Sequence, residues 1–179
     1  ADGARGFGPP APDRPVGVLM DTGEVADGYV LVTMIQTKDV LLMSNDGRVV
    51  NKWAGDHYTG AAAYLLENGN LLRTASLDEN FDFGFNGQWG FMGGRIEERD
   101  WDNNLVWEFE YATERFMLHH DITVKPDGNV LALAFERFSQ EEAVAAGFNP
   151  EQLVETHDFE LYSEKIIEID PSTNEIVWE

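Results

Sequence analysis

The stretch Ala62–Ala75, AAYLLENGNLLRTA, decides the fold of this chain because it places an Asn-Gly pair between two runs of strand-forming residues. Asn-Gly favours a tight β-hairpin, since both central positions of a type I′ turn need a positive φ. The stretch Asp121–Phe135, DITVKPDGNVLALAF, repeats the pattern, with Asp127-Gly128 lying 59 residues after Asn68-Gly69. The two stretches therefore predict two equivalent hairpins.

A second hairpin motif follows each of these turns and also occurs near the start of the chain. Its copies are Val49-Val50, Leu105-Val106 and Ile176-Val177, and they recur after 56 and 71 residues. Tandem repeats of turn-linked short strands are typical of β-propeller blades. Each repeat predicts two hairpins, or four strands.

The predicted fold is therefore all-β, a β-propeller with about three blades. We place the blades at about residues 28–53, 60–109 and 119–179, after an extended segment at 1–15. Trp107 and Phe109 lie two residues apart and so share one sheet face, where we expect them to pack between blades. Three blades make a poor closed ring, so we expect further blades or other chains to complete it.

One segment, Ser139–Gly147, departs from the strand pattern. Its sequence SQEEAVAAG offers Ser139 as an N-cap, Glu142 as the partner in a capping box and Gly147 as a C-cap. We predict one short helix here, inserted between strands of the third repeat.

The charge of the chain excludes some partners. Its net charge is −21, from 33 acidic and 12 basic residues. Nucleic acid and anionic membrane surfaces are disfavoured, because both are bound chiefly through Lys and Arg. Solubility in salty water explains the acidity most simply, and binding of divalent cations is the alternative.

Composition also bears on location. The chain has no cysteine and no apolar run long enough for a membrane-spanning helix. Its first residues, ADGARGFGPPAPDRP, are rich in Gly, Pro and Ala, and would suit a mature N-terminus left after signal cleavage. This is compatible with a periplasmic or extracellular protein.

Two acidic clusters are candidate calcium sites, because hard cations prefer oxygen ligands. One joins Asp78–Asn80 to Asp82, and the other joins Asp100 to Asp102–Asn104. Neither matches an EF-hand loop, and turn chemistry accounts for them more simply.

The run Phe81–Phe91, FDFGFNGQWGF, is either a stacking surface for an aromatic ligand or a packing loop.

An ordered set of segments carries a resemblance to a known family. The segments are DGYVLVTM, AAYLLENGNLLR, GGRIEERDWDNNLVWEFEY, HHDITVKPDGNVLALAFER, EEAVAAGFNP and IIEIDPSTNEIVWE. In this order and spacing they resemble the aryl-sulfate sulfotransferase family, over nearly all of the chain.

The resemblance implies a six-bladed propeller, exported from the cytoplasm, that moves a sulfuryl group from a phenolic sulfate ester to a phenol. The family's transfer passes through a histidine intermediate and needs no nucleotide sulfate donor or other cofactor. Its later blades carry a Trp-Thr-His-x-Asn motif and an arginine, and this chain contains neither that motif nor the corresponding region. Activity would therefore require completion by further blades.

Four histidines are candidates for such chemistry: His57, His119, His120 and His157. His119 and His120 stand at the entry of a predicted inner strand, and as strand neighbours they should point to opposite faces. By resemblance, the His-His-Asp motif supplies a stabiliser or proton donor near the sulfate, and we favour His120, with His119 second. A hydrogen-bonded strand end is the alternative. His57 approaches the same funnel or lies in a surface loop, and His157 is expected in an acidic loop.

Three arginines are candidates for holding an anionic substrate: Arg73, Arg95 and Arg137. Sulfuryl transfer spreads negative charge over the moving group, so a site must gather donors around it. Arg73 and Arg137 are the substrate-binding candidates beside His57. An ion pair with a neighbouring carboxylate is the alternative for each arginine.

Two functions follow. The first is an exported arylsulfotransferase-like enzyme, completed by further blades. The second is a non-enzymatic extracellular structural protein, in which a partial propeller pairs its open edges with other copies of the chain and forms oligomers or filaments.

Overall fold

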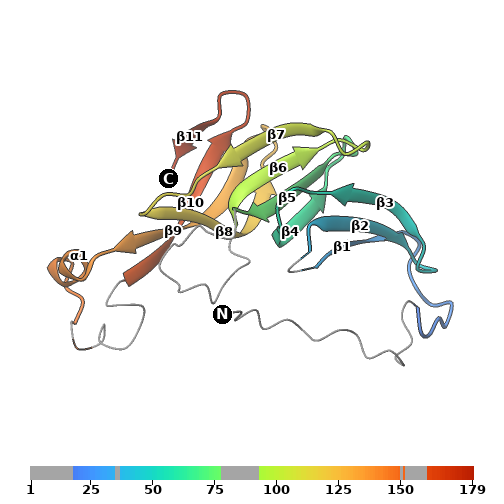
Figure 1. Ribbon diagram of the computed structural model, residues 1–179, viewed down its shortest axis with the longest axis horizontal. Helices are drawn as coiled ribbons and strands as arrows, with labels where there is room; N and C mark the ends of the chain where they lie inside the picture. The colour runs from blue at the N-terminus through green and yellow to red at the C-terminus, as the bar shows by residue number, and fades with distance from the viewer. Residues whose placement is uncertain (1–17, 35–36, 78–92, 150, 152–160) are drawn as a thin grey trace.

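The computed structural model describes residues 18–34, 37–77, 93–149, 151 and 161–179. Over these ranges the chain forms three antiparallel sheets and one short helix (Figure 1). The first sheet has the order β1-β2-β3, with β1 at Tyr29–Thr33, β2 at Asp39–Ser44 and β3 at Val49–Ala54. The predicted all-β character is confirmed.

The other two sheets each have four strands that follow one another in sequence order. The second contains β4 (Thr59–Leu65), β5 (Leu71–Ser76), β6 (Gly94–Arg99) and β7 (Leu105–Glu110). The third contains β8 (Phe116–Val124), β9 (Val130–Phe138), β10 (Leu161–Asp170) and β11 (Glu175–Trp178). Each is a meander of the kind that forms a propeller blade.

The first sheet differs from the prediction of four strands per repeat, because its described residues form three. Its β1 precedes a connection to β2, as β5 and β9 precede the connections to β6 and β10. The described strands of this sheet therefore correspond to the last three of the other sheets. Closure of the sheets into a ring stays a prediction.

The predicted hairpin turns are present, but the prediction that they are type I′ turns is wrong. Gly69 and Gly128 have φ of 87° and 93°, whereas Asn68 and Asp127 do not have positive φ. The Gly69 N–H donates to the Leu66 carbonyl at 2.9 Å. This is a type I turn followed by a left-handed glycine, the usual three-residue hairpin loop. Such a loop requires a positive φ at one residue only.

The same β-bulge occurs in the outer hairpin of every sheet. The strand register shifts immediately after the pairs Leu42–Asn51, Glu98–Trp107 and Glu168–Trp178. Since a bulge fixes the local register and twist, these three pairs occupy equivalent positions. The structure thus confirms the internal repeat and defines which residues correspond.

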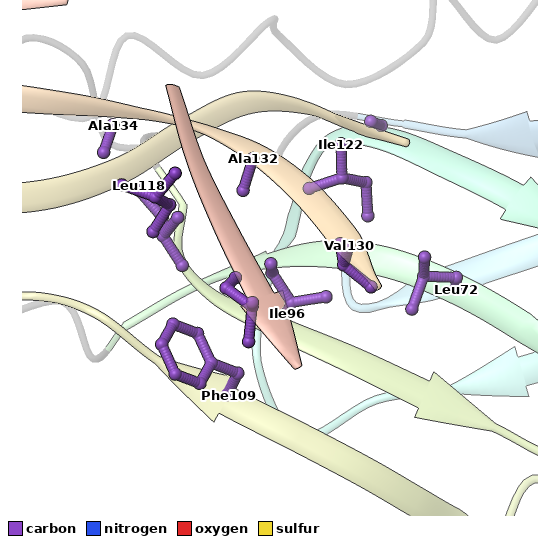
Figure 2. Packing of buried hydrophobic residues seen from close by; sticks show 11 residues of the cluster. Leu72, Ile96, Phe109, Leu118, Ile122, Val130, Ala132 and Ala134 are labelled. Atoms are coloured by element: carbon purple, nitrogen blue, oxygen red, sulfur yellow. The ribbon is translucent and has the colours of Figure 1, made fainter. Parts of the chain in front are cut away.

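The main core lies between the second and third sheets (Figure 2). Leu72, Ile96 and Phe109 of the second sheet face Ile122 and Val130 of the third, and all five are at most 8% exposed. A smaller cluster of Val40, Leu42, Trp53 and Leu71 joins the first sheet to the second. The predicted packing of large aromatic side chains between sheets is confirmed.

The predicted helix is also confirmed, as α1 at Gln140–Ala145. Both hydrogen bonds of the capping box between Ser139 and Glu142 are present. The helix ends where Gly147, with φ 97°, donates to Val144 and Phe148 donates to Ala143. These two hydrogen bonds form the Schellman motif, which a glycine at this position favours.

Candidate functional site

The candidate site is built on an irregular part of β8. Its ladder with β9 is regular up to Leu118 and resumes at Ile122, so residues 119–121 fall in a bulge. His120 lies in this bulge with φ 53°, a left-handed conformation that non-glycine residues adopt at a cost. Such strain is found most often at functional sites.

Gly93 helps to hold this backbone in place. A Cβ at residue 93 would lie 2.6 Å from the Leu118 carbonyl oxygen, closer than any real Cβ contact. Only glycine therefore allows the chain just before β6 to approach β8 here. The second sheet supports the bulge through this contact.

His119 is buried, with 3% of its surface exposed, and its ring stacks on Phe135 at a centroid distance of 3.7 Å. Burial, together with the neighbouring His120, lowers the pKa of His119 to about 4. Its ring is therefore uncharged at neutral pH. Its Nε2 is buried and has no hydrogen-bond partner among the described residues.

The two histidine rings contact each other, contrary to the expectation that strand neighbours point to opposite faces. Their Nδ1 atoms lie 2.8 Å apart and the rings meet edge to face. Alternation applies to regular strands, and the left-handed His120 breaks it. One Nδ1 must donate and the other accept, so each ring fixes the tautomer of its neighbour.

Two side chains of the second sheet form hydrogen bonds beside the exposed His120, one to its backbone and one to Asp121. The Thr74 hydroxyl lies 3.5 Å from the His120 carbonyl oxygen, which accepts from it. The Tyr64 hydroxyl donates to Asp121 at 2.7 Å, and Asp121 also accepts from the Ile122 N–H at 2.8 Å. The Asp121 hydrogen bond raises the pKa of Tyr64, since it stabilises the protonated phenol.

Sequence reasoning did not identify Tyr64 and Thr74 as part of this region. Both come from strands that precede β8 by more than 40 residues, Thr74 by 46 counted to His120. The local sequence around each reads as ordinary strand. The Asp of the His-His-Asp motif was the one available signal for Asp121.

The structure places Arg73 in a buried ion pair rather than on an open surface. Its Nε and Nη2 donate to Glu97 at 3.0 and 2.8 Å, and its Nη1 donates to the Lys38 carbonyl at 2.9 Å. Neither side chain is exposed by more than 1%. This is the ion-pair alternative, and an anion-binding role for Arg73 stays a prediction.

Arg95 and Arg99 join the same cluster, which we call the Glu97 cluster. The Glu97 carboxylate accepts from both of them as well as from Arg73, each at 3.0 Å. Burial acts to raise the pKa of Glu97, but the charge of Arg73 and hydrogen bonds from Arg99 and Arg73 outweigh it and hold the value at about 2. The cluster is a structural centre of the second sheet.

The structure describes two of the remaining candidates, His57 and Arg137. His57 is half-buried in the connection between β3 and β4. Arg137 lies near the end of β9, where its Nη1 is 3.5 Å from the Glu114 carbonyl. His157 and the run Phe81–Phe91 lie outside the described residues. The roles proposed for these residues stay predictions.

The acidic candidates for calcium are in part explained by turn geometry. Asp100 accepts from the Asn104 backbone N–H and side chain, both at 2.8 Å. In the described ranges no group of three or more His, Cys, Asp or Glu side chains gathers as a metal site would require. The cluster Asp78–Asn80 with Asp82 lies outside the described residues, so calcium binding stays a prediction.

Within the residues that the structure describes, no helix is long and apolar enough to cross a bilayer.

No family model matches the chain. No curated protein matches it either. The resemblance to arylsulfotransferases therefore stays an expectation.

The low pKa of His119 predicts a loss of stability in mildly acidic solution. Its pKa is about 4 in the fold and near 6.5 when unfolded, so the unfolded chain binds more protons between these values. We expect the free energy of unfolding to fall as the pH drops from 6.5 towards 4. Urea titrations across this range should show it, and the slope should diminish in a His119→Phe variant. An unchanged slope in that variant would contradict a neutral buried His119.

Proposed function

We propose that this chain is part of an exported β-propeller of arylsulfotransferase type, in which His120 serves sulfuryl transfer between phenolic compounds. The observation that carries the proposal is the histidine pair. An exposed imidazole is held at a strained bulge by a hydrogen bond to a buried neutral partner. Such an arrangement fixes the orientation of a proton donor.

In the proposed reaction His120 acts at its Nε2, because its Nδ1 is used by His119. An attacking imidazole, which we expect from further blades, forms a bond to sulfur while the bond between sulfur and the aryl oxygen breaks. The leaving aryl oxygen takes its proton from His120. An acceptor phenol then returns a proton to His120 as its oxygen attacks sulfur and the nitrogen–sulfur bond breaks.

The His119 side chain supports proton donation by His120, because its Nδ1 lies within hydrogen-bond distance of the His120 Nδ1. While His120 carries a proton on both ring nitrogens, its Nδ1–H donates to the Nδ1 of His119, which stays uncharged. After proton transfer His120 is neutral and keeps this hydrogen bond. The pair can thus pass through both states without rearrangement, as preorganised catalysis requires.

Titration of the chain with 4-nitrophenyl sulfate, followed by NMR of the histidine Cε1–Hε1 groups, tests the substrate class without needing turnover. We expect the His120 signal to shift most and the His157 signal to stay unchanged. Saturating shifts that avoid His120 would overturn the proposal, as would the absence of any shift.

A second candidate function is extracellular assembly without catalysis. One observation favours it: Ile166 and Trp178, on the outer side of the third sheet, are 47% and 57% exposed. Mass spectrometry of the natively isolated protein separates the two candidates. A mass well above 20.1 kDa favours the enzyme, and a mass of 20.1 kDa favours assembly.

A further inference from the structure

We infer that the outer face of the third sheet docks the β2–β3 turn, Ser44–Arg48, of a second copy of this chain. We call this surface the β11 face and define it by Leu131, Leu133, Ile166 and Trp178. The inference deepens the assembly function and rests on it, and it uses none of the sulfuryl-transfer chemistry.

The first step is the equivalence of three residues. The bulge shared by all sheets makes Asn51, Trp107 and Trp178 occupy the same position in their last strands. In the first two sheets this side chain donates to the outer hairpin turn of the following sheet. Asn51 Nδ2 donates to the Trp101 carbonyl at 3.0 Å, and Trp107 Nε1 donates to Asn174 Oδ1 at 2.7 Å.

The contacted turns return a hydrogen bond in both cases. Asn103 Nδ2 donates to the Ala54 carbonyl at 2.9 Å, and Asn174 Nδ2 donates to the Glu108 carbonyl at 3.4 Å. Both asparagines have left-handed backbones, with φ of 70° and 59°. In both places the last strand of one sheet is therefore joined to the outer hairpin turn of the next by a pair of hydrogen bonds, although the atoms that accept them differ.

The third member of the set, Trp178, has the same donor as Trp107, but no hydrogen bond joins it to a turn among the described residues. Trp178 is 57% exposed, and no acceptor for its Nε1 lies in the described part of the chain. Ile166 shows the same difference, because its equivalents two residues before the bulge, Val40 and Ile96, are both 0% exposed under the next sheet. The β11 face thus has the composition of an inter-sheet contact and the exposure of a surface.

The chain carries a matching turn at its other end. In Ser44–Arg48 the Gly47 N–H donates to the Ser44 carbonyl at 2.8 Å, and the Ser44 N–H donates to Arg48 at 2.9 Å. Asp100–Asn104 has the same two bonds, from Asn103 to Asp100 and from Asp100 to Asn104. Gly47, with φ 86°, corresponds to the left-handed Asn103.

This turn supplies an acceptor for the Trp178 indole, although Gly47 has no side chain to return the hydrogen bond that Asn103 and Asn174 donate. Asn45 holds the position of Trp101, so its carbonyl oxygen is the acceptor expected for the Trp178 indole. Its side chain is already engaged with the Ala26 carbonyl at 2.8 Å, which leaves the backbone oxygen for the contact. Two copies related by a two-fold axis would make this contact twice and close as a dimer.

Sedimentation equilibrium of the chain at low and high salt is the first test. We expect a dimer that strengthens with salt, because each copy has a net charge of −21. Trp178→Ser should weaken dimerisation by about 30-fold or more, as for a hot-spot tryptophan. Val106→Ser, which changes a residue 54% exposed on β7, is the matched control and should have no effect.

Disulfide trapping is the second test, and the absence of cysteine gives it a clean background. The Asn45→Cys/Trp178→Cys variant should form an interchain disulfide. Asn51→Cys/Trp101→Cys, the equivalent pair within one chain, is the internal control and should form an intrachain bond.

Three results would overturn the inference. They are a monomer at both salt concentrations, a dimer that Trp178→Ser leaves intact, and a disulfide dimer of the single Trp178→Cys variant, which would show a back-to-back contact. A monomer would also remove the assembly function. A dimer through another surface would leave that function standing and remove only the docking site.

Discussion

Replacing Glu97 with alanine is expected to lower the free energy of unfolding by about 3–5 kcal/mol, the cost of breaking a buried ion pair by removing one partner. The carboxylate is fully buried and is shared by three guanidinium groups. Arg73 is 0% and Arg99 7% exposed, so neither gains water when Glu97 is lost. Each would keep a buried charge without its counterion, and this penalty dominates the effect.

Urea unfolding of the parent and of Glu97→Ala measures this change. Glu110→Ala is the matched control, because it removes an exposed carboxylate that also pairs with Arg95 and should cost at most about 1 kcal/mol. Equal losses in the two variants would show that the Glu97 cluster does not act as a buried unit.

The Glu97 cluster also predicts where acid should act on the fold. The pKa of Glu97 is about 2 in the fold and 4.5 in its ordinary state, so its stabilisation is complete above pH 4.5 and is lost as the pH falls through 2. This range lies mostly below that of His119, which runs from 6.5 to about 4. The two groups therefore act at different stages of acidification.

The sheets could be predicted because their determinants are local. Asn68-Gly69 and Asp127-Gly128 each mark a hairpin within a few residues of the chain, and Ser139 with Glu142 marks the helix start in the same way. The type of turn could not be predicted, because Asn-Gly also fits a type I turn with a left-handed glycine. The three-stranded first sheet was missed because repetition alone implied four strands.

The site could be predicted only in part, because its geometry depends on contacts distant in sequence. The His-His pair stood out, but its rings meet through a positive φ at His120 that no local pattern signals. Gly93, just before β6, and Thr74, on β5, approach the bulge from the second sheet. For Arg73, the structure shows a buried ion pair with Glu97, and sequence does not reveal burial of that kind.

In the completed propeller, His120→Ala is expected to lower sulfuryl transfer by about two to four powers of ten, the range typical of a lost proton donor or oxyanion stabiliser. The rate is followed as release of 4-nitrophenol from 4-nitrophenyl sulfate with phenol as acceptor. His157→Ala should leave the rate unchanged. His120→Gly serves as a second variant, because glycine accepts the left-handed backbone of this residue without strain.

The pair of variants separates a chemical role from a structural one. If His120 acts only by shaping the bulge, His120→Gly should keep the parent's rate, because the backbone it requires is preserved. If His120 donates a proton, both variants should lose activity alike.

The loss should be smaller with sulfate donors whose leaving phenols have a low pKa, because these need less help from an acid. In both variants the pKa of His119 should rise, since the charge of its neighbour is one cause of its low value. Full activity in His120→Gly would therefore contradict the proposed chemistry even if the fold and the pKa of His119 behave as expected.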